Sequence, residues 1–462
     1  MSLTSRLILL VFIFFPLFTV SAQISIPKKF TTASTGNDVD DCAIWVNPSD
    51  PEKSLVFVND KGPAVEYGGL YAYTLDGTLL QKTLFHRPQN PDIRYSVVFG
   101  DDTIDVLVCV DRESGNNTYN KIRIFKINPS YAETLDGVLT EITTSDGILT
   151  GQNEAYGHGL YLRPSDGALF SIVAGCSQTD FTQIRLESDG AGKVKGTIVR
   201  KWGGSDIKGD LCEGICCDDE LGYIYISDEN YQILKYYADP DKNENTLISA
   251  FAKDDGIVAD REGINIYRCD DNNGYILLSN QGKNEIIVYD RVTNEFIGSV
   301  IPDGMMDCDG LDVTAIPLGS QFPHGMAAFH LGTASGSQFG FYDWSDIASG
   351  LNLSTPCDAK RPGSGNSAIT KRHKCTKIAG KRPVLQFDNQ GIHLKNASFP
   401  DLSITISIFN VQGKKIHSQH ISNQINGEAI ITVPCHIVHS GIYMVKCNAG
   451  NNTLFTGMLT IE

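Results

Sequence analysis

A pair of short strands recurs six times between residues 54 and 344 of this 462-residue chain. The first strand of each pair ends in a polar turn, and its six copies are SLVFVND (54–60), DVLVCVDR (105–112), ALFSIVAG (168–175), GYIYISDE (222–229), GYILLSNQ (274–281) and HGMAAFHL (324–331). A second strand follows each copy, as in GGLYAYTLDG (68–77) and NEIIVYDR (284–291). The copies begin about 50 to 60 residues apart, a period that is typical of the blades of a β-propeller.

A blade cannot bury both faces of its sheet alone, so neighbouring blades must stack and the ring must close around a central channel. Most apolar segments from residue 30 to 350 are short, rich in Val, Ile, Tyr and Phe, and bounded by turn residues. We therefore predict an all-β chain with a six-bladed β-propeller over residues 24–352. A β-sandwich is the rival architecture, but sandwiches do not repeat six times at this spacing.

The two ends of the chain carry other signals. Arg6, an apolar run over residues 7–20 and then Ser21 and Ala22 form the pattern of a secretory signal peptide, predicted over residues 1–22. Residues 353–384 hold eight Lys or Arg against one Asp and are predicted to be a basic linker. Residues 385–462 show the alternating strands of a small β-sandwich. We expect a protein that is secreted or held at the cell surface and that does not span a membrane.

Charge and cysteine content narrow the choice of function. The 54 acidic residues exceed the 38 basic ones and give a formal net charge of −16, which argues against nucleic-acid binding and fits cation binding or a soluble extracellular surface. Twelve cysteines suit an oxidising compartment. We predict buried free thiols at Cys109, Cys216 and Cys217, and disulfides Cys357–Cys375 and Cys435–Cys447.

An acidic residue begins the strand that precedes each strand pair. These residues are Asp41, Asp92, Glu154, Glu213, Glu262 and Asp309. The innermost strand of a propeller blade lines the channel, so we expect the six carboxylates to converge on one axis, where their repulsion must be neutralised. Calcium takes six to eight oxygen ligands in a tolerant geometry. The alternative is that each carboxylate only caps a strand or binds a turn amide.

Further polar residues crowd the same end of the repeats. The acidic ones are Asp40, Asp228, Glu229, Asp260, Asp307 and Asp312, and the others are Lys61, Arg94, Tyr95, Arg112, Tyr156 and Gln281. Guanidinium and ammonium groups bind phosphate oxygens. A metal ion and basic residues over a carboxylate-lined channel mouth can transfer a phosphoryl group to water. Lys61 and Arg112 could equally be ordinary surface residues.

Eight motifs, in this order and spacing, closely resemble those of the β-propeller phytases. They are DDCAIWVNPSDPEKS, NPDIRYSVVF, EAYGHGLYL, CEGICCDDELGYIYISDEN, DREGINIY, GYILLSNQG, DCDGLDV and YDWSDIA, and they span roughly residues 28–350. The resemblance implies a phosphoric monoester hydrolase that cleaves phytate (myo-inositol hexakisphosphate) by attack of metal-bound water, with several calcium ions as cofactors. It also implies two neighbouring phosphate pockets, one for cleavage and one for affinity.

The ring argument and the resemblance together define the expected site. The expected catalytic residues are Glu213, Glu229, Glu262 and Tyr156; the substrate-binding residues are Lys61, Asp92, Arg94 and Arg112; the metal ligands are Asp40, Asp41, Glu213, Asp260, Glu262, Gln281, Asp307 and Asp309. Two positions depart from the family pattern. Asp60 and a single Lys61 follow Asn59 where the family has paired lysines, and Cys176 stands where the family has a phosphate-binding lysine. Fewer cations weaken the hold on phosphate, so turnover or substrate preference would differ.

The C-terminal segments ISIFNVQGKKI and SGIYMVK resemble the sorting domains of type IX secretion in Bacteroidetes-like bacteria. This resemblance implies a role in export or surface attachment, with the export machinery as partner, and no chemistry. The expected ligand is phytate or another phosphorylated small molecule, and we expect a monomer. Two other functions remain open: a calcium-dependent propeller hydrolase such as a lactonase, and a non-catalytic surface-binding propeller. The crowded carboxylates and the arginines at the blade ends argue against both.

Overall fold

The computed structural model describes most of the propeller and the strands that follow it. The described residues are 24–34, 38–62, 68–112, 120–130, 137–176, 180–209, 211–242, 244–269, 273–332, 338–354, 357 and 359–362, together with seven strands after residue 383. The chain divides into two compact units, residues 1–364 and 365–462. The predicted signal peptide lies outside the described residues.

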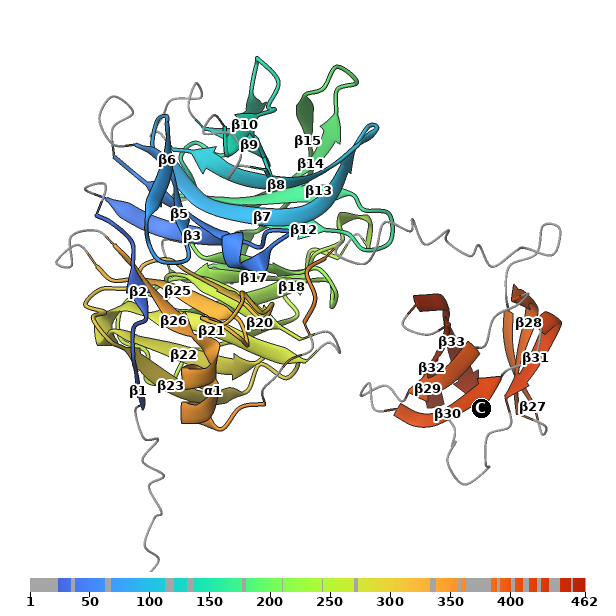
Figure 1. Cartoon of the computed structure of the whole chain (residues 1–462). Helices are drawn as coiled ribbons and strands as arrows, with labels where there is room; N and C mark the ends of the chain where they lie inside the picture. The colour runs from blue at the N-terminus through green and yellow to red at the C-terminus, as the bar shows by residue number, and fades with distance from the viewer. Residues whose placement is uncertain are drawn as a thin grey trace, which may run out of the picture. The chain divides into compact units, whose positions relative to one another are not determined.

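The first three blades are antiparallel sheets whose strands follow one another in chain order (Figure 1). Blade one consists of β3 (Val39–Trp45), β4 (Leu55–Asp60), β5 (Gly69–Thr74) and β6 (Leu79–Leu84). Blade two consists of β7 (Pro88–Phe99), β8 (Asp102–Asp111), β9 (Lys121–Ile127) and β10 (Leu139–Glu141), with β11 (Ile148–Leu149) also paired to β9. Blade three consists of β12 (Ala155–Leu162), β13 (Leu169–Gly175), β14 (Asp180–Ser188) and β15 (Val194–Gly203).

The last three blades repeat this order. Blade four consists of β16 (Ile215–Asp218), β17 (Tyr223–Asp228), β18 (Gln232–Tyr237) and β19 (Ser249–Phe251). Blade five consists of β20 (Ile264–Arg268), β21 (Gly274–Asn280), β22 (Glu285–Asp290) and β23 (Phe296–Pro302). Blade six consists of β24 (Leu311–Thr314), β25 (Met326–His330) and β26 (Phe339–Asp343). Four 3₁₀ helices lie between the strands: η1 (Pro51–Lys53), η2 (Gly204–Asp206), η3 (Pro240–Lys242) and η4 (Gln281–Lys283).

The N-terminal strands close the ring, which the sequence repeat did not predict. Strand β2 (Phe30–Thr31) pairs with β26 and completes blade six, and β1 (Ile24–Ile26) adds a parallel fifth strand to β23 of blade five. The first strands of the propeller are thereby joined to its last two blades, which closes the ring. The inner strands then contact one another in a closed ring, β3–β7–β12–β16–β20–β24 and back to β3. The predicted six-bladed propeller is confirmed.

Each interface between neighbouring blades has its own apolar core. Between blades four and five, for example, Tyr225 and Ile233 pack with Ile266, Ile276 and Ile287, all of them buried. Equivalent clusters fill the other five interfaces. Because both faces of every sheet are covered in this way, the strands read as nearly continuous apolar runs. Polar side chains from different blades meet at the ends of the inner strands and along the channel that these strands line.

The propeller unit extends beyond the predicted boundary at residue 352. After helix α1 (Trp344–Leu351), the chain packs back on the propeller, where Cys357 forms a disulfide with Cys269 of blade five. Ala359 is 8% and Arg361 7% exposed, and Arg361 donates to the carbonyl of Val46, so these two residues of the predicted linker pack on the propeller. The predicted pairing Cys357–Cys375 is therefore wrong, and Cys435 lies outside the described residues.

The second unit contains seven strands in two sheets. One sheet has the order β27–β28–β31 and the other β30–β29–β32–β33. Their bounds are β27 (Val384–Asp388), β28 (Gly391–Phe399), β29 (Ile404–Phe409), β30 (Lys415–Ile421), β31 (Ile425–Ile431), β32 (Gly441–Ala449) and β33 (Asn452–Ile461). The all-β class is as expected, and the sandwich packing stays a prediction. Within the described residues of the chain, no helix has the length and apolar content needed to cross a membrane.

Candidate active site

Acid–glycine pairs stand just before the inner strands of blades four, five and six. They are Glu213–Gly214, Glu262–Gly263 and Asp309–Gly310. A Cβ on Gly214 would lie 2.1 Å from the carbonyl oxygen of Glu262, and one on Gly310 would lie 2.1 Å from Oδ1 of Asp41. Glycine therefore allows neighbouring inner strands to approach at this level. The close approach brings the preceding acidic side chains together.

Three of these acidic side chains form a compact group, called here the acidic cluster: Glu213, Glu229 and Glu262. One carboxylate oxygen from each lies within 4.8 Å of the others, and the residues are only 5%, 2% and 7% exposed. Oε1 of Glu213 and Oε1 of Glu229 are buried without a hydrogen-bond partner. Three anionic groups in such a space are expensive unless a cation or protons neutralise them.

The protonation behaviour of the cluster reflects that cost. Burial, and next the charge of Asp40, raise the pKa of Glu213 to about 8. Burial and the charge of Glu213 raise the pKa of Glu229 to about 8 as well. The pKa of Glu262 is also raised well above its ordinary value, by burial and by both neighbours. Each carboxylate thus resists ionisation, first because it is buried and next because other carboxylates lie close to it.

The strand register corrects the predicted ring of six equivalent carboxylates. In blade four Ile215 pairs with Ile226, so Glu213 lies two residues before this pair. The matching pairs are Cys42–Val58 in blade one and His158–Val173 in blade three, and the residues two positions earlier are Asp40 and Tyr156. In blade two Asp92 pairs with Val108, and the equivalent pair in blade four is Cys216 with Tyr225. Asp92 is therefore equivalent to Cys216 and lies three residues further along its strand than the position of Glu213. Asp41, Asp92 and Glu154 are therefore not equivalent to Glu213, because bulges shift the register of the first three inner strands.

A second set of equivalent positions surrounds the first. The residue that follows the second strand is Lys61 in blade one, Arg112 in blade two, Cys176 in blade three, Glu229 in blade four and Gln281 in blade five. Two blades thus supply a cation, one a thiol, one a carboxylate and one an amide. The site is asymmetric, with its cations on blades one and two and most of its acidic groups on blades four to six.

Lys61 faces the acidic groups directly. Its Nζ lies 2.5 Å from Oδ1 of Asp40, a residue that is 1% exposed. Burial alone would lower the pKa of Lys61, but the carboxylates of Asp40 and Glu213 raise it above its ordinary value, so the ammonium stays charged. The neighbouring Asp60 is buried and accepts a bond from the backbone of Gly62, which makes it part of the turn.

Asp309, on the neighbouring blade six, is held from two sides. Gln281 donates from Nε2 to Oδ1 of Asp309 at 2.5 Å, and Nδ1 of His330 lies 3.2 Å from Oδ2. Burial acts to raise the pKa of Asp309, but the hydrogen bond and charge of His330 together with Lys61 lower it. Asp309 therefore ionises more readily than an ordinary aspartate side chain.

Arg112 lies on the ring of Tyr156. The guanidinium carbon is 4.3 Å from the centre of this ring, and Nε donates to Oε1 of Glu154 at 3.0 Å. Burial and the charges of Glu213 and Glu229 raise the pKa of Tyr156, so it stays a neutral phenol. Tyr156 and Arg112 thus lie beside the acidic cluster as a donor and a cation.

Asp260 and Asp307 lie at the rim of this site. Asp260 is half-buried, and its charge contributes to the raised pKa of Glu229. Asp307 is exposed, and burial of part of its side chain together with Asp309 raises its pKa. The structure thus gathers Asp40, Lys61, Arg112, Tyr156, Glu213, Glu229, Asp260, Glu262, Gln281, Asp307 and Asp309 around the N-terminal ends of the inner strands.

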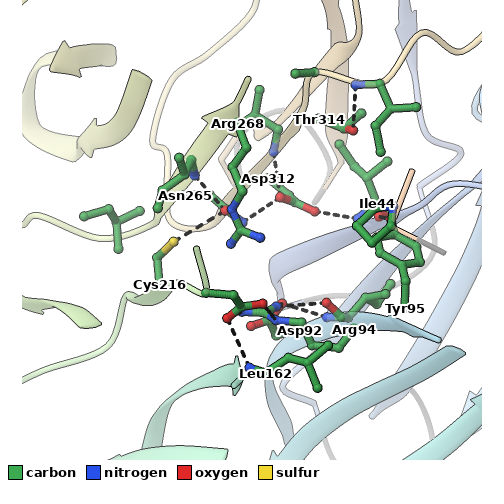
Figure 2. Close-up of a pocket in the computed structure, with 18 of the residues that line it drawn as sticks. Ile44, Asp92, Arg94, Tyr95, Leu162, Cys216, Asn265, Arg268, Asp312 and Thr314 are labelled. Atoms are coloured by element: carbon green, nitrogen blue, oxygen red, sulfur yellow. Dashed lines mark hydrogen bonds and ion pairs between the residues drawn. The ribbon is translucent and has the colours of Figure 1, made fainter. Parts of the chain in front are cut away.

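Asp92 and Arg94 lie elsewhere, in the wall of a cavity of about 420 Å³ along the inner strands, called here the channel cavity (Figure 2). Arg94 is 5% exposed and donates from Nε to Asp219 at 2.7 Å and from Nη1 to Asp92 at 2.8 Å. It also donates to the carbonyl oxygen of Leu160. All of its recorded partners are groups of the channel wall, so the predicted contact with substrate is not supported.

Asp41 likewise accepts hydrogen bonds from neighbouring groups of the inner strands. Its Oδ2 accepts from Nδ2 of Asn90 at 2.9 Å and its Oδ1 accepts from the amide of Cys42. Burial raises the pKa of Asp41. Asp228, another acidic residue noted in the sequence, accepts from the amides of Lys208 and Gly209 and has a structural role in blade four.

Two residues of the site had no sequence signal of their own. Gln89 is 0% exposed and lies between Asp40 and Arg112, and His330 lies against Asp309. Aligning the six repeats by the ends of their second strands, instead of by the first acidic residue, would have placed Gln89 near the ring. His330 lies at a strand end that carries Ser in blades four and five, so sequence comparison between blades gives no hint of it.

A closed six-bladed propeller that gathers buried carboxylates opposite two cations has the groups expected of a phosphoester hydrolase. Comparison with known proteins gives the family. The chain belongs to the phytase family, whose model matches residues 18–358. The 3-phytase of Bacillus subtilis (strain 168) is 32% identical over 333 residues, which cover 69% of this chain and 82% of that protein. The protein is therefore a phytase, a phosphoric monoester hydrolase.

Comparison also covers the tail and the overall structure. Residues 388–461 match the model of the secretion system C-terminal sorting domain, and the protein is accordingly secreted or located at the cell surface. A luciferin-regenerating enzyme matches with a TM-score of 0.40 and 11% identity, covering 67% of this chain and 91% of that one. The β-propeller domain of Swd1 from Myceliophteria thermophila matches with a TM-score of 0.40 and 8% identity, covering 66% and 83%. Neither match bears on the function.

Proposed function

We propose that this phytase requires calcium and that the acidic cluster is its metal centre. The observation that carries the proposal is the geometry of Glu213, Glu229 and Glu262, whose oxygens lie within 4.8 Å of one another in a nearly buried space. Oε1 of Glu213 and Oε1 of Glu229 have no hydrogen-bond partner, so no protein donor stabilises a negative charge on these two atoms. A cation that binds there removes a cost that the fold otherwise bears.

The donor chemistry favours calcium over a transition metal. The cluster offers carboxylate oxygens, and the neighbouring Asp40, Asp309 and Gln281 add carboxylate and amide oxygens. Hard oxygen donors in a loose arrangement suit calcium, whereas zinc and copper select imidazole and thiolate. Asp260 and Asp307 at the rim extend the same donor type and would hold further ions.

The cationic side of the site would hold the phosphate group. Lys61 is kept charged by Asp40, and Arg112 is kept flat against Tyr156. A guanidinium binds phosphate oxygens in a forked geometry, and an ammonium adds a point charge. Cys176 at the equivalent position of blade three contributes no cation, so the described site provides two. The two-cation grip is consistent with a different substrate preference or a lower affinity than a three-cation grip would give.

The reaction is the hydrolysis of a phosphate monoester, in which water attacks phosphorus and the inositol oxygen leaves. Calcium, when bound, would reduce the negative charge of the phosphate oxygens and acidify a water molecule that it holds. Arg112 and Lys61 orient the phosphate and oppose its growing charge. Tyr156 stays protonated and can donate its hydroxyl proton to a phosphate oxygen as a hydrogen bond. The buried position of the cluster keeps bulk water from competing with these contacts.

Phosphate release from phytate tests the proposal. We expect release in the presence of calcium, none with excess chelator, and recovery when calcium is returned. Glu213→Ala should lose nearly all activity at every calcium concentration, whereas the matched variant Glu295→Ala, at an exposed acidic residue, should behave as the wild type. Release that continues in chelator would refute the metal centre.

A further inference from the structure

We propose that Gln89 is a positioning residue of the phytase site, because its side-chain amide connects Asp40 to Arg112 and thereby fixes where Arg112 presents its free donors. The inference rests on the proposed function, since it assumes that Arg112 holds a phosphate group. Gln89 lies in β7 at 0% exposure, so it reaches neither solvent nor substrate itself. Its effect on the reaction must therefore pass through its two partners.

The amide has one partner of each charge. With its nitrogen toward Asp40 and its oxygen toward Arg112, the nitrogen lies 3.2 Å from Oδ2 of Asp40 and the oxygen 3.0 Å from Nη1 of Arg112. This orientation follows from the partners, because a carboxylate only accepts hydrogen bonds and a guanidinium only donates them. The opposite orientation would leave both ends facing groups of their own kind.

No other common side chain of this length serves both partners. Glutamate would accept from Arg112 but repel Asp40, and lysine would donate to Asp40 but repel Arg112. A primary amide is neutral and combines one acceptor with two donors. The contacts with Asp40 and Arg112 thus require a neutral side chain at position 89 that both donates and accepts hydrogen bonds.

Local backbone geometry supports a specific placement of this side chain. The pairing of β7 with β8 shifts register between Gln89 and Asp92, and Asn90 adopts a φ of +36°. Bulges re-aim side chains and are frequent next to active sites, and a positive φ outside glycine costs free energy. The chain accepts this strain at the point where Gln89 is turned toward Asp40 and Arg112.

The contacts of Arg112 leave one edge of its guanidinium for a ligand. Nε donates to Glu154, Nη1 donates to Gln89, and the flat face lies on Tyr156. Among the described residues, Nη2 has no hydrogen-bond partner. Without the contact with Gln89, the guanidinium would be held only through Nε and could adopt other orientations. In those orientations its free edge would not face the phosphate group.

The same amide ties Arg112 to the second cation. Oδ1 of Asp40 holds Lys61 at 2.5 Å, so a continuous series of contacts runs Lys61–Asp40–Gln89–Arg112. Lys61 and Arg112 are therefore both positioned relative to the same buried carboxylate, that of Asp40. This arrangement would set the distance between them and hence their fit to a single phosphate group.

The test uses the full-length protein and two variants, Gln89→Leu and Gln89→Glu. Leucine keeps the volume and removes both hydrogen bonds, so we expect KM for phytate to rise about tenfold, the size of one charge-assisted contact, with kcat changed by less than about threefold. Glutamate keeps an acceptor for Nη1 of Arg112 but repels Asp40, so KM should rise by less than it does in Gln89→Leu. Calorimetric binding of myo-inositol hexakissulfate, which is not hydrolysed as phytate is, should weaken in the same proportion without relying on turnover.

A double-mutant cycle with Arg112→Ala separates positioning from mere folding. If Gln89 acts through Arg112, Gln89→Leu should add little to the loss already caused by Arg112→Ala. Full additivity of the two losses, or an unchanged KM in Gln89→Leu with an unchanged melting temperature, would overturn the inference. Failure of the proposed function gives a different result, because the wild-type protein itself would then show no calcium-dependent phosphate release.

Discussion

Two neighbouring regions along the propeller axis hold carboxylates, half-buried ones in the channel cavity and buried ones in the acidic cluster, and the two regions differ in the hydrogen bonds they offer. In the channel cavity (Figure 2), Arg94 donates hydrogen bonds to Asp92 and Asp219. A backbone amide also donates to each carboxylate there: that of Leu160 to Asp92, that of Leu162 to Asp219 and that of Ile44 to Asp312. In the acidic cluster, Glu213 and Glu229 each keep one buried oxygen without a partner.

This difference distinguishes carboxylates that hold the fold together from carboxylates that are kept for a ligand. A buried charge with a full set of hydrogen bonds contributes to a rigid structure, and its removal leaves partners unsatisfied. A buried charge without partners destabilises the fold until something binds to it. Substitutions in the acidic cluster should therefore lower activity more than stability, and substitutions in the channel cavity should lower stability more than activity.

The largest expected effect is on activity, in the acidic cluster. Glu262→Gln removes one of the three charges while keeping the size of the side chain, and we expect phosphate release to fall by at least about a thousandfold, as for other removals of groups that stabilise a transition state. Without calcium, the free energy of unfolding should stay equal or increase, because repulsion within the cluster is reduced. A strong loss of stability in urea unfolding would contradict the assignment of the cluster to ligand binding.

The channel cavity should give the reverse result. Asp219→Ala leaves Arg94 without the partner at 2.7 Å from its Nε, and breaking a buried ion pair of this kind costs about 3 kcal/mol of unfolding free energy. Activity per folded molecule should be unchanged. As a control, Glu187→Ala breaks the exposed pair with Arg185 and should cost less than about 0.5 kcal/mol. Equal losses in the two variants would show that the cavity pair is not structural.

Calcium should stabilise the protein through the acidic cluster and not through the cavity. At a free calcium concentration of 100 times Kd, one site adds about 2.7 kcal/mol to the free energy of unfolding. The increase in melting temperature with calcium should be lost in Glu213→Ala and kept in Asp219→Ala. Scanning calorimetry of the wild type and the two variants over a series of calcium concentrations measures this increase in melting temperature. An equal increase in all three proteins would show that calcium binds elsewhere.

The smallest expected effect is a pH dependence in the cavity wall. Burial raises the pKa of Asp312 to about 7 from an ordinary value of 3.8. The folded state then binds the proton more tightly than the unfolded state, so the contribution of this group is present below an ordinary Asp pKa and is lost as the pH rises toward 7. The slope is at most about 1.4 kcal/mol per pH unit.

Comparison with Asp312→Asn isolates this term. The unfolding free energy of the variant relative to the wild type should rise between pH 4.5 and pH 7, by an amount on the order of 1 kcal/mol or more. The slope is the measurement, because the amide also changes the hydrogen bonds to Ile44 and Asn265 at every pH. Parallel stability curves for the two proteins would mean that Asp312 is ionised throughout.

The fold could be predicted almost completely from sequence, because its signal is repeated. Six strand pairs at a regular spacing allow one interpretation of each unit to support the others, and the structure has them as β4–β5, β8–β9, β13–β14, β17–β18, β21–β22 and β25–β26. The closure by β1 and β2 could not be predicted, since strands of three and two residues carry too little pattern. The packing of Arg361 against Val46 was hidden by the basic composition around it.

The site was predicted in part, and the errors have one cause. Glu213, Glu262 and Asp309 were placed correctly relative to one another because a glycine follows each and no bulge intervenes. Asp41, Asp92 and Glu154 were aligned with them by residue type alone, while bulges in β3, β7 and β12 shift the register. A shift of one residue in a strand turns a side chain to the other face, so a motif alignment cannot detect it.

The sequence by itself determined the number of blades and the acidic character of the axis, since these depend on periodicity and on residue types that recur, and its motifs indicated the family. Tertiary structure alone decided which carboxylates lack partners, that Arg94 is bound within the wall, and that Gln89 lies between Asp40 and Arg112. Those properties depend on distances of a few ångströms between different blades. Such distances are set by strand register and ring closure, which no local stretch of sequence encodes.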